Sequence, residues 1–89
     1  MKTFNDTEKQ FLANYRPADR HFTYASEVEQ VKDTLNLRVM SVESLQDTRD
    51  AVVDYYCELQ DAEVANYWDL NNAMKSVTAV IDNVMYNVL

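Results

Sequence analysis

The chain has 89 residues, of which 47% are hydrophobic and 26% are charged, and its formal net charge is −7. This composition excludes a disordered chain, and the negative charge disfavours binding to duplex nucleic acid or to an anionic membrane. Glycine is absent and proline occurs once, which disfavours a turn-rich β protein because glycine supplies the positive-φ positions of hairpin turns. We therefore expect one all-α domain over residues 1–89.

The first helix is expected to begin at Thr7, because the segment 7–10 (TEKQ) has the pattern of a capping box. Phe11, Leu12 and Tyr15 form its apolar side. Pro17 disfavours the helical conformation of the residue before it. The helix should therefore end at Tyr15 or Arg16.

A second capping box, residues 26–29 (SEVE), predicts a helix that begins at Ser26 and reaches about Met40. Val28, Val31 and Leu35 follow at helical spacing. A start nearer Pro17 stays open, because proline suits the first turn of a helix.

A long helical hairpin should follow the first two helices. Ser41 or Ser44 can cap a helix that runs to about Val64, and the weak helix formers in residues 65–72 indicate a bend. From Leu70 a final helix runs almost to the end of the chain. Its apolar stripe comprises Leu70, Ala73, Met74, Val77, Val80, Ile81, Val84, Met85 and Val88, and its opposite face comprises Asn72, Lys75, Asp82 and Asn83. This stripe is wider than one partner helix covers, so we expect the bundle to self-associate.

Most aromatic residues and the cysteine are assigned to packing. Tyr55, Tyr56, Tyr67, Trp68 and Tyr86 fall in or near the apolar stripes, so core or interface positions are expected for them. Cys57 is the single cysteine, and its acidic neighbours disfavour a reactive thiol. A lone cysteine, no leader peptide and no apolar run of about 18 residues lead us to expect a cytoplasmic protein.

No catalytic or metal-binding motif is present, so neither an enzyme nor a cofactor is expected. The single histidine, His21, has no partner motif. Five carboxylates recur at spacings of three and four in the third helix, namely Asp47, Asp50, Asp54, Glu58 and Asp61. We expect this acidic row to be a solvated face. An alternative is that it imitates the phosphates of a nucleic acid and inhibits a host or immune protein.

The cations are concentrated in the first half of the chain. Residues 1–49 contain seven Lys and Arg against eight Asp and Glu, whereas residues 50–89 contain Lys75 alone against seven acids. We therefore expect an anionic ligand to bind the first half.

The segment 14–24 (NYRPADRHFTY) places three aromatic rings beside two arginines. An aromatic ring can stack on a base while a cation holds its phosphate, so this segment is a candidate nucleotide site. In the alternative interpretation, Tyr15 and Phe22 attach the segment to the core while Arg16 and Arg20 are solvated.

Several short motifs of this chain resemble the anti-CBASS cyclic-nucleotide sponges, small helical phage proteins that sequester cyclic oligonucleotide signals. The likeness lies in Tyr15-Arg16-Pro17 or alternatively Phe22-Thr23-Tyr24, in the helix that follows Ser26, and in Asn72-Ala73-Met74 and Ala79-Val80-Ile81 near the carboxyl end. It covers most of the chain in outline.

The resemblance implies a noncatalytic, phage-encoded protein of the host cytoplasm. It implies a compact homohexamer that binds cyclic dinucleotides such as cyclic GMP-AMP and denies them to an immune effector. In one register, Tyr15 stacks on a base beside Arg16 and Lys32 lies near a phosphate. In the other register, Tyr24 and Arg38 take these roles. Members of the family commonly have histidine after the first tyrosine, where this chain has Arg16.

Overall fold

The computed structural model describes residues 2–19 and 22–87. Over these residues the chain is helical and contains no strand, which confirms the all-α prediction. The elements in chain order are α1 (Asp6–Asn14), α2 (Ala25–Leu35), a 3₁₀ turn η1 (Leu37–Val39), α3 (Val42–Asp61) and α4 (Tyr67–Asn87). The predictions for Arg20, His21 and Val88 lie outside the described residues.

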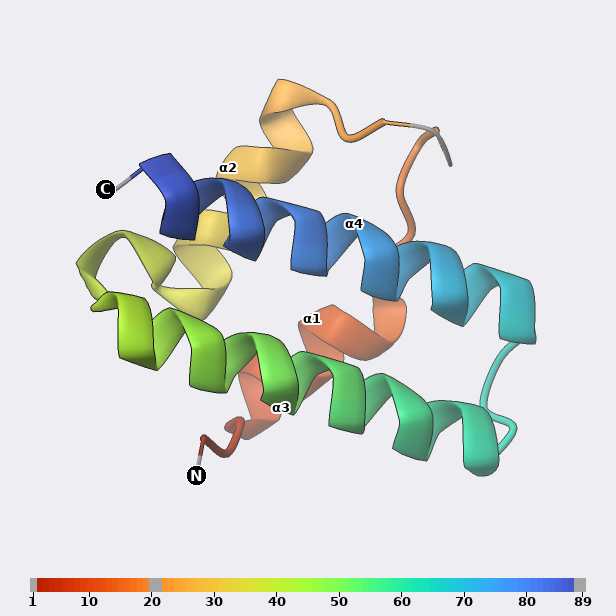
Figure 1. The fold of residues 1–89 in the computed structure, drawn as a ribbon. Coiled ribbons are helices and arrows are strands. Elements are labelled where there is room, and N and C mark those ends of the chain that lie inside the picture. Colours follow the sequence, from red (N-terminus) through yellow and green to blue (C-terminus); the bar gives the residue numbers. More distant parts are fainter. Residues whose placement is uncertain (1, 20–21, 88–89) are drawn as a thin grey trace.

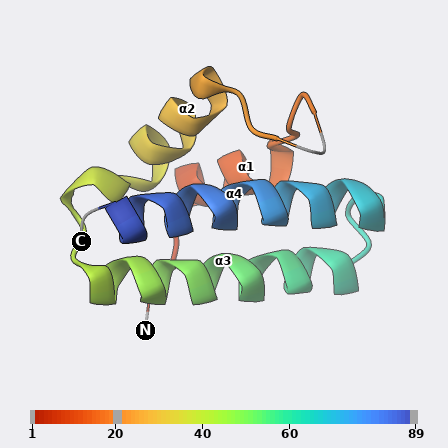
Figure 2. The ribbon, with the colours of Figure 1, turned by 45° about the horizontal axis from the view of Figure 1, so that its top comes forward.

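Helices α3 and α4 form the expected hairpin and lie side by side along their length (Figure 1). Helix α2 packs on α4, and α1 contacts both α2 and α3, so α4 has neighbours on more than one side (Figure 2). The Tyr56 hydroxyl on α3 donates a hydrogen bond to the backbone carbonyl of Leu12, over 2.7 Å. Both residues are fully buried, so this bond ties α1 to the hairpin inside the core.

The start of α1 differs from the prediction by two residues. Asn5 is the capping residue: its side chain accepts a hydrogen bond from the Glu8 backbone amide over 2.8 Å, and the Glu8 carboxylate accepts one from the Asn5 amide over 2.9 Å. The capping box assigned to Thr7 is therefore wrong, because an asparagine cap with a glutamate three residues later was available upstream. The predicted end is confirmed, since Tyr15 is the extended residue that follows the last turn.

Helix α2 is shorter than predicted. It begins after Tyr24, which makes no side-chain cap, and Ser26 lies inside its first turn, so the Ser26 capping box is wrong. It ends at Leu35 instead of Met40, because Asn36 takes the left-handed conformation with φ 57°. Asparagine tolerates this conformation better than most residues, and it directs the chain into η1.

The limits of the hairpin follow from two caps. The Ser41 hydroxyl accepts from the Ser44 amide over 3.1 Å, which confirms Ser41 as the start of α3. Helix α3 ends at Asp61, and Glu63 turns the chain with φ 55°. The Asn66 side chain then accepts from the Trp68 amide over 2.8 Å, so α4 begins three residues before Leu70. The bend therefore precedes most of the segment 65–72.

The apolar stripe of α4 is covered within one chain. Its members Leu70, Ala73, Val77, Val80, Ile81 and Val84 are all buried. Ser76 and Thr78 are buried as well, so α4 is enclosed over much of its circumference. The width of the stripe is thus accounted for by α2, α3 and η1, and it no longer indicates a second protomer.

The remaining aromatic residues divide into two groups. Tyr56 is buried and Tyr55 is partly buried against the core, whereas Tyr67, Trp68 and Tyr86 are exposed. Cys57 is also exposed, so its assignment to packing is wrong. Within the described part of the chain, no helix is both long enough and apolar enough to cross a bilayer.

Candidate functional site

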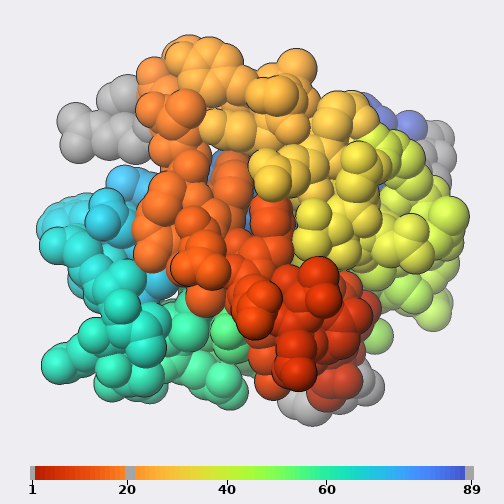
Figure 3. Space-filling view, turned by 180° about the vertical axis from the view of Figure 1, so that it is seen from behind, coloured from red at the N-terminus to blue at the C-terminus, as the bar shows by residue number. Residues whose placement is uncertain are grey.

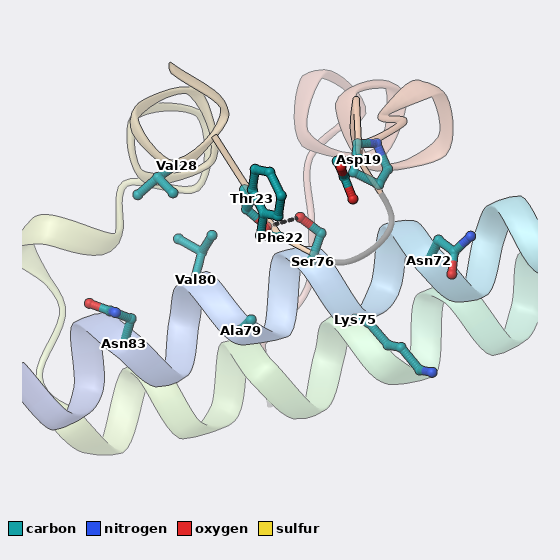
Figure 4. Close-up of a pocket in the computed structure, with 11 residues that line it drawn as sticks. Asp19, Phe22, Thr23, Val28, Asn72, Lys75, Ser76, Ala79, Val80 and Asn83 are labelled. Atoms are coloured by element: carbon teal, nitrogen blue, oxygen red, sulfur yellow. Dashed lines mark hydrogen bonds between the residues drawn. The ribbon is translucent and has the colours of Figure 1, made fainter. Parts of the chain in front are cut away.

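A cavity of about 470 Å³ lies between residues 17–19 and 22–23, the first turn of α2 and one face of α4 (Figure 4). Its α4 side is formed by residues at helical spacing: Asn72, Lys75, Ser76, Ala79, Val80 and Asn83. Its other side includes Phe22, Thr23 and Val28. The volume falls in the range of about 300–1,000 Å³ that is usual for small-molecule sites.

One serine holds the wall of this cavity together. The Ser76 Oγ atom lies 2.8 Å from the Tyr15 hydroxyl and 2.7 Å from the Thr23 hydroxyl, both within hydrogen-bond distance. The Glu27 carboxylate accepts from the Ala18 amide over 2.8 Å and from the Tyr15 hydroxyl over 3.4 Å. These bonds hold Tyr15, Ala18 and Thr23 against α2 and α4. The hollow lies beside these residues, where no further described helix packs on α4.

The Tyr15 side chain in this wall is a neutral phenol. Burial is the main reason that the pKa of Tyr15 lies above its usual value of 10.0; the Ser76 bond opposes this shift, and the negative charge of Glu27 adds to it. The phenol therefore stays protonated at neutral pH and can donate one hydrogen bond to Ser76 or Glu27.

The cavity mouth offers an aromatic surface and a cation. The Phe22 side chain is 56% exposed, and its ring meets the Tyr24 ring edge to face with 4.9 Å between centroids. Lys75 is exposed, and no described carboxylate lies within ion-pair distance of it. Figure 4 shows Phe22 beside Ser76 and the Lys75 side chain extending along α4 in the direction away from Phe22. Its flexible stem allows the ammonium group to reach a ligand at the mouth.

None of the five predicted site residues lines this cavity. Tyr15 is only 7% exposed and lies behind the wall, bonded to Ser76. The Arg16 guanidinium donates to the carbonyls of Ala13 and Tyr15, over 3.0 and 2.7 Å. The packing interpretation of the segment therefore holds for Tyr15 but fails for Phe22, whose ring is exposed.

The other three predicted residues do not line the cavity either and do not meet one another. Tyr24 is 45% exposed and contacts Phe22. Lys32 lies on α2 one turn beyond Val28, on the same helix face. The Arg38 guanidinium pairs with Glu29 and Asp33 on the surface. Neither predicted register, Tyr15 with Lys32 or Tyr24 with Arg38, is brought together around this hollow.

The sequence interpretation missed the contribution of α4. It placed an anionic ligand in the first half of the chain, whereas the lysine that lines the cavity is the single cation of the second half. The available signal was the polar strip of the last helix, in which Asn72, Lys75 and Asn83 share a face. Asp82, assigned to the same face, instead pairs with Arg49 on α3 over 2.8 Å.

The acidic row of α3 is a separate surface. Its five members, Asp47, Asp50, Asp54, Glu58 and Asp61, are all exposed, as expected of a solvated face. A second hollow of about 480 Å³ lies between this row and the amino-terminal segment, and Lys2 and Lys9 are among its lining residues. Among the described residues, no three His, Cys, Asp or Glu side chains are grouped to hold a metal ion.

The candidate functions rest on the geometry of the chain itself and on the motifs of its sequence. Comparison with protein-family models, with curated proteins and with solved structures found no match in any of the three.

Proposed function

We propose that this protein is a noncatalytic binding protein for a small anionic ligand with an aromatic base, and that it withholds this ligand from another protein. The observation that carries the proposal is the cavity between residues 17–19 and 22–23 and α4, with the exposed Phe22 ring and the exposed Lys75 among its lining residues. The resemblance to anti-CBASS sponges narrows the ligand class to cyclic dinucleotides.

Each part of such a ligand has a suitable group in the cavity. A base stacks on Phe22, since stacking on an aromatic ring accepts any base. The Asn72 and Asn83 amides can both donate to and accept from base edges, and the Lys75 ammonium binds phosphate as a point charge. Val28, Ala79 and Val80 supply an apolar side that excludes water from these contacts.

Self-association is part of the same proposal. A cyclic dinucleotide carries two phosphates, whereas Lys75 is the single described cation that lines the cavity. Two cavities that face each other across a protomer interface would bring two lysines to one ligand. The expected homo-oligomer, of six chains as the resemblance implies, would thus complete the site.

Calorimetry with a panel of cyclic dinucleotides, including cyclic GMP-AMP, tests the proposal. We expect tight binding and recovery of the intact ligand after the protein is denatured. Phe22→Ala should weaken binding by about 1–3 kcal/mol, the usual value of one stacked base, and Lys75→Ala should weaken it through the phosphate. Absence of binding across the panel would exclude the proposal.

Matched variants distinguish the cavity from the two sequence registers. Tyr24→Ala and Lys32→Ala remove an aromatic ring and a lysine that do not line the cavity. If these variants weaken binding and Phe22→Ala does not, the ligand lies outside the cavity. Light scattering with and without the ligand gives the oligomer size, and a monomer in both cases would remove self-association from the proposal.

A second candidate is an acidic inhibitor that binds a host or immune protein in place of nucleic acid. It is favoured by the acidic row, whose residues 47–61 place exposed carboxylates along about 21 Å of one helix face. We expect the combined variant Asp50→Asn, Asp54→Asn, Glu58→Gln and Asp61→Asn to lose action against a nucleic-acid-binding host protein. Unchanged action would exclude this candidate.

A further inference from the structure

The turn between α3 and α4 carries an exposed apolar cluster, here called the tip cluster: Val64, Tyr67 and Trp68. Their exposed fractions are 57%, 58% and 68%. The two rings meet edge to face, with 5.9 Å between centroids and an interplanar angle of 81°. Figures 1 and 2 show this turn at one end of the hairpin, beyond α1 and α2, and Figure 3 shows it in teal at the edge of the molecule.

The tip cluster is not explained by the core. None of its three residues belongs to the buried cluster or to the apolar residues that pack against it. Exposed tryptophan and tyrosine side chains are enriched among the residues that supply most of the binding energy at protein interfaces. The sequence predicted a core or an interface position for these rings. Because both rings are exposed, the core position is excluded and the interface position remains.

The sequence on either side of the tip cluster is acidic, and the nearest cation in sequence is Lys75, about two turns of α4 beyond Trp68. Residues 50–74 contain six carboxylates and no lysine, arginine or histidine. Three of these acids, Asp61, Glu63 and Asp69, lie within three residues of the tip cluster and are exposed. No described cation lies within ion-pair distance of any of them.

We infer that the tip cluster is a docking surface for a protein partner that presents an apolar pocket bordered by lysine or arginine. Trp68 and Tyr67 would fill the pocket, while the surrounding carboxylates meet the cations. A second copy of this tip would bring like charges together, which costs several kcal/mol at an interface. An anionic membrane is disfavoured for the same electrostatic reason. This surface is separate from the proposed nucleotide cavity and does not depend on it.

Trp68 provides the measurement, because it is the single tryptophan of the chain. The probe is a synthetic amphipathic helical peptide of leucine and lysine, with a leucine and glutamate peptide of the same pattern as its control. We expect the lysine peptide to shift Trp68 emission to shorter wavelength and added salt to weaken this effect. The glutamate peptide should leave the emission unchanged.

Two variants locate the binding. Tyr67→Ala should raise the dissociation constant for the lysine peptide at least about tenfold, as expected for an anchor residue at an interface. Tyr86→Ala removes another exposed tyrosine, near the other end of α4, and should leave the constant unchanged. Circular dichroism verifies that both variants keep the fold, since both side chains are exposed.

Several outcomes would overturn the inference. These are an unchanged emission with the lysine peptide, an equal response to the glutamate peptide, or equal effects of the two variants. An emission shift that grows with protein concentration in the absence of peptide would assign the tip cluster to a second copy. A shift with phosphatidylserine vesicles alone would assign it to a membrane surface.

Discussion

The two long helices have nearly the same length but play different parts. On α3 the buried residues form a single stripe, Leu45, Thr48, Val52, Tyr56 and Leu59, and the remaining surface is largely exposed and acidic. On α4 three consecutive residues, Ser76, Val77 and Thr78, are all buried. Side chains at consecutive positions point 100° apart around a helix, so burial of three in a row means that neighbouring elements enclose this part of α4. Helix α3, in contrast, is covered on one side.

This difference separates two kinds of surface. The outward face of α3 can carry charge, because its carboxylates are exposed and, among the described residues, only the amino-terminal part of the chain borders them. The exposed strip of α4 is narrow, and its residues Lys75, Ala79 and Asn83 line the cavity. We therefore expect substitutions on α4 to act on stability and ligand binding together, and substitutions on the outer face of α3 to act on partners alone.

The largest expected effect comes from shortening a buried residue of α4. Ile81 is fully buried, and Ile81→Ala should reduce the free energy of unfolding by about 2–5 kcal/mol, through lost burial and the cavity left behind. The matched change Val53→Ala, at a partly buried position of α3, should cost clearly less. Denaturant unfolding followed by circular dichroism measures both, and equal losses would contradict the dependence of the loss on burial.

A smaller effect is expected at the Ser76 hydroxyl, which joins Tyr15 and Thr23 to α4. Ser76→Ala leaves the Tyr15 and Thr23 hydroxyls without their shared partner and should cost about 1–3 kcal/mol. Thr78→Val is the control, because the Thr78 hydroxyl bonds to the Met74 and Lys75 carbonyls of its own helix. Unfolding curves of the two variants should differ accordingly, and a Thr78→Val loss as large as that of Ser76→Ala would refute the role of Ser76.

Alkaline pH should weaken the fold through its packed tyrosines. Burial is the main cause that raises the pKa of Tyr15, Tyr55 and Tyr56 above 10.0. The unfolded phenols lose their protons as pH passes about 10 while the folded ones keep theirs, so stability is present in full below that pH and falls above it.

The contribution of Tyr56 to this pH dependence can be isolated. Tyr56 is the most deeply buried of the three phenols, so Tyr56→Phe should make the loss of stability above about pH 10 shallower. Unfolding measured at about pH 9 and about pH 11 tests this. The same slope in the variant would show that ionisation of Tyr56 does not contribute.

The smallest expected effect lies in the turn between the two helices. Glu63 has φ 55°, a conformation that costs a non-glycine residue about 1–2 kcal/mol. Glu63→Gly relieves this strain but frees the unfolded chain, so a net gain below about 1 kcal/mol is expected. Asn36→Gly, with φ 57°, should gain less because asparagine tolerates this region. Thermal unfolding measures both, and a larger gain at Asn36 would contradict the explanation.

The architecture was predictable because it depends on periodicity. The buried stripe of α3 and the apolar stripe of α4 repeat at spacings of three and four, and Ser41 is one of the two caps that the sequence indicated. Helix ends were predicted less well, because several polar residues can cap within a few positions. Asn5, and not Thr7, caps α1 for this reason. Asn36 ends α2 early because it takes the left-handed conformation.

The candidate site could not be predicted from local pattern. Phe22 and Lys75 are 53 positions apart in the sequence, and only the folded chain brings them to one cavity. Tyr15 continues the apolar spacing of the first helix, whereas no period indicates whether Phe22, in an irregular part of the chain, faces the core. The structure buries the first and exposes the second.

The bond between Tyr15 and Ser76 joins residues 61 positions apart, so the cavity it supports exists only in the folded chain. Binding and folding are therefore thermodynamically linked at this wall. A ligand at 100 times its dissociation constant would add about 2.7 kcal/mol to the free energy of unfolding. A screen of metabolites by thermal shift can thus find the occupant of the cavity from the rise in unfolding temperature alone.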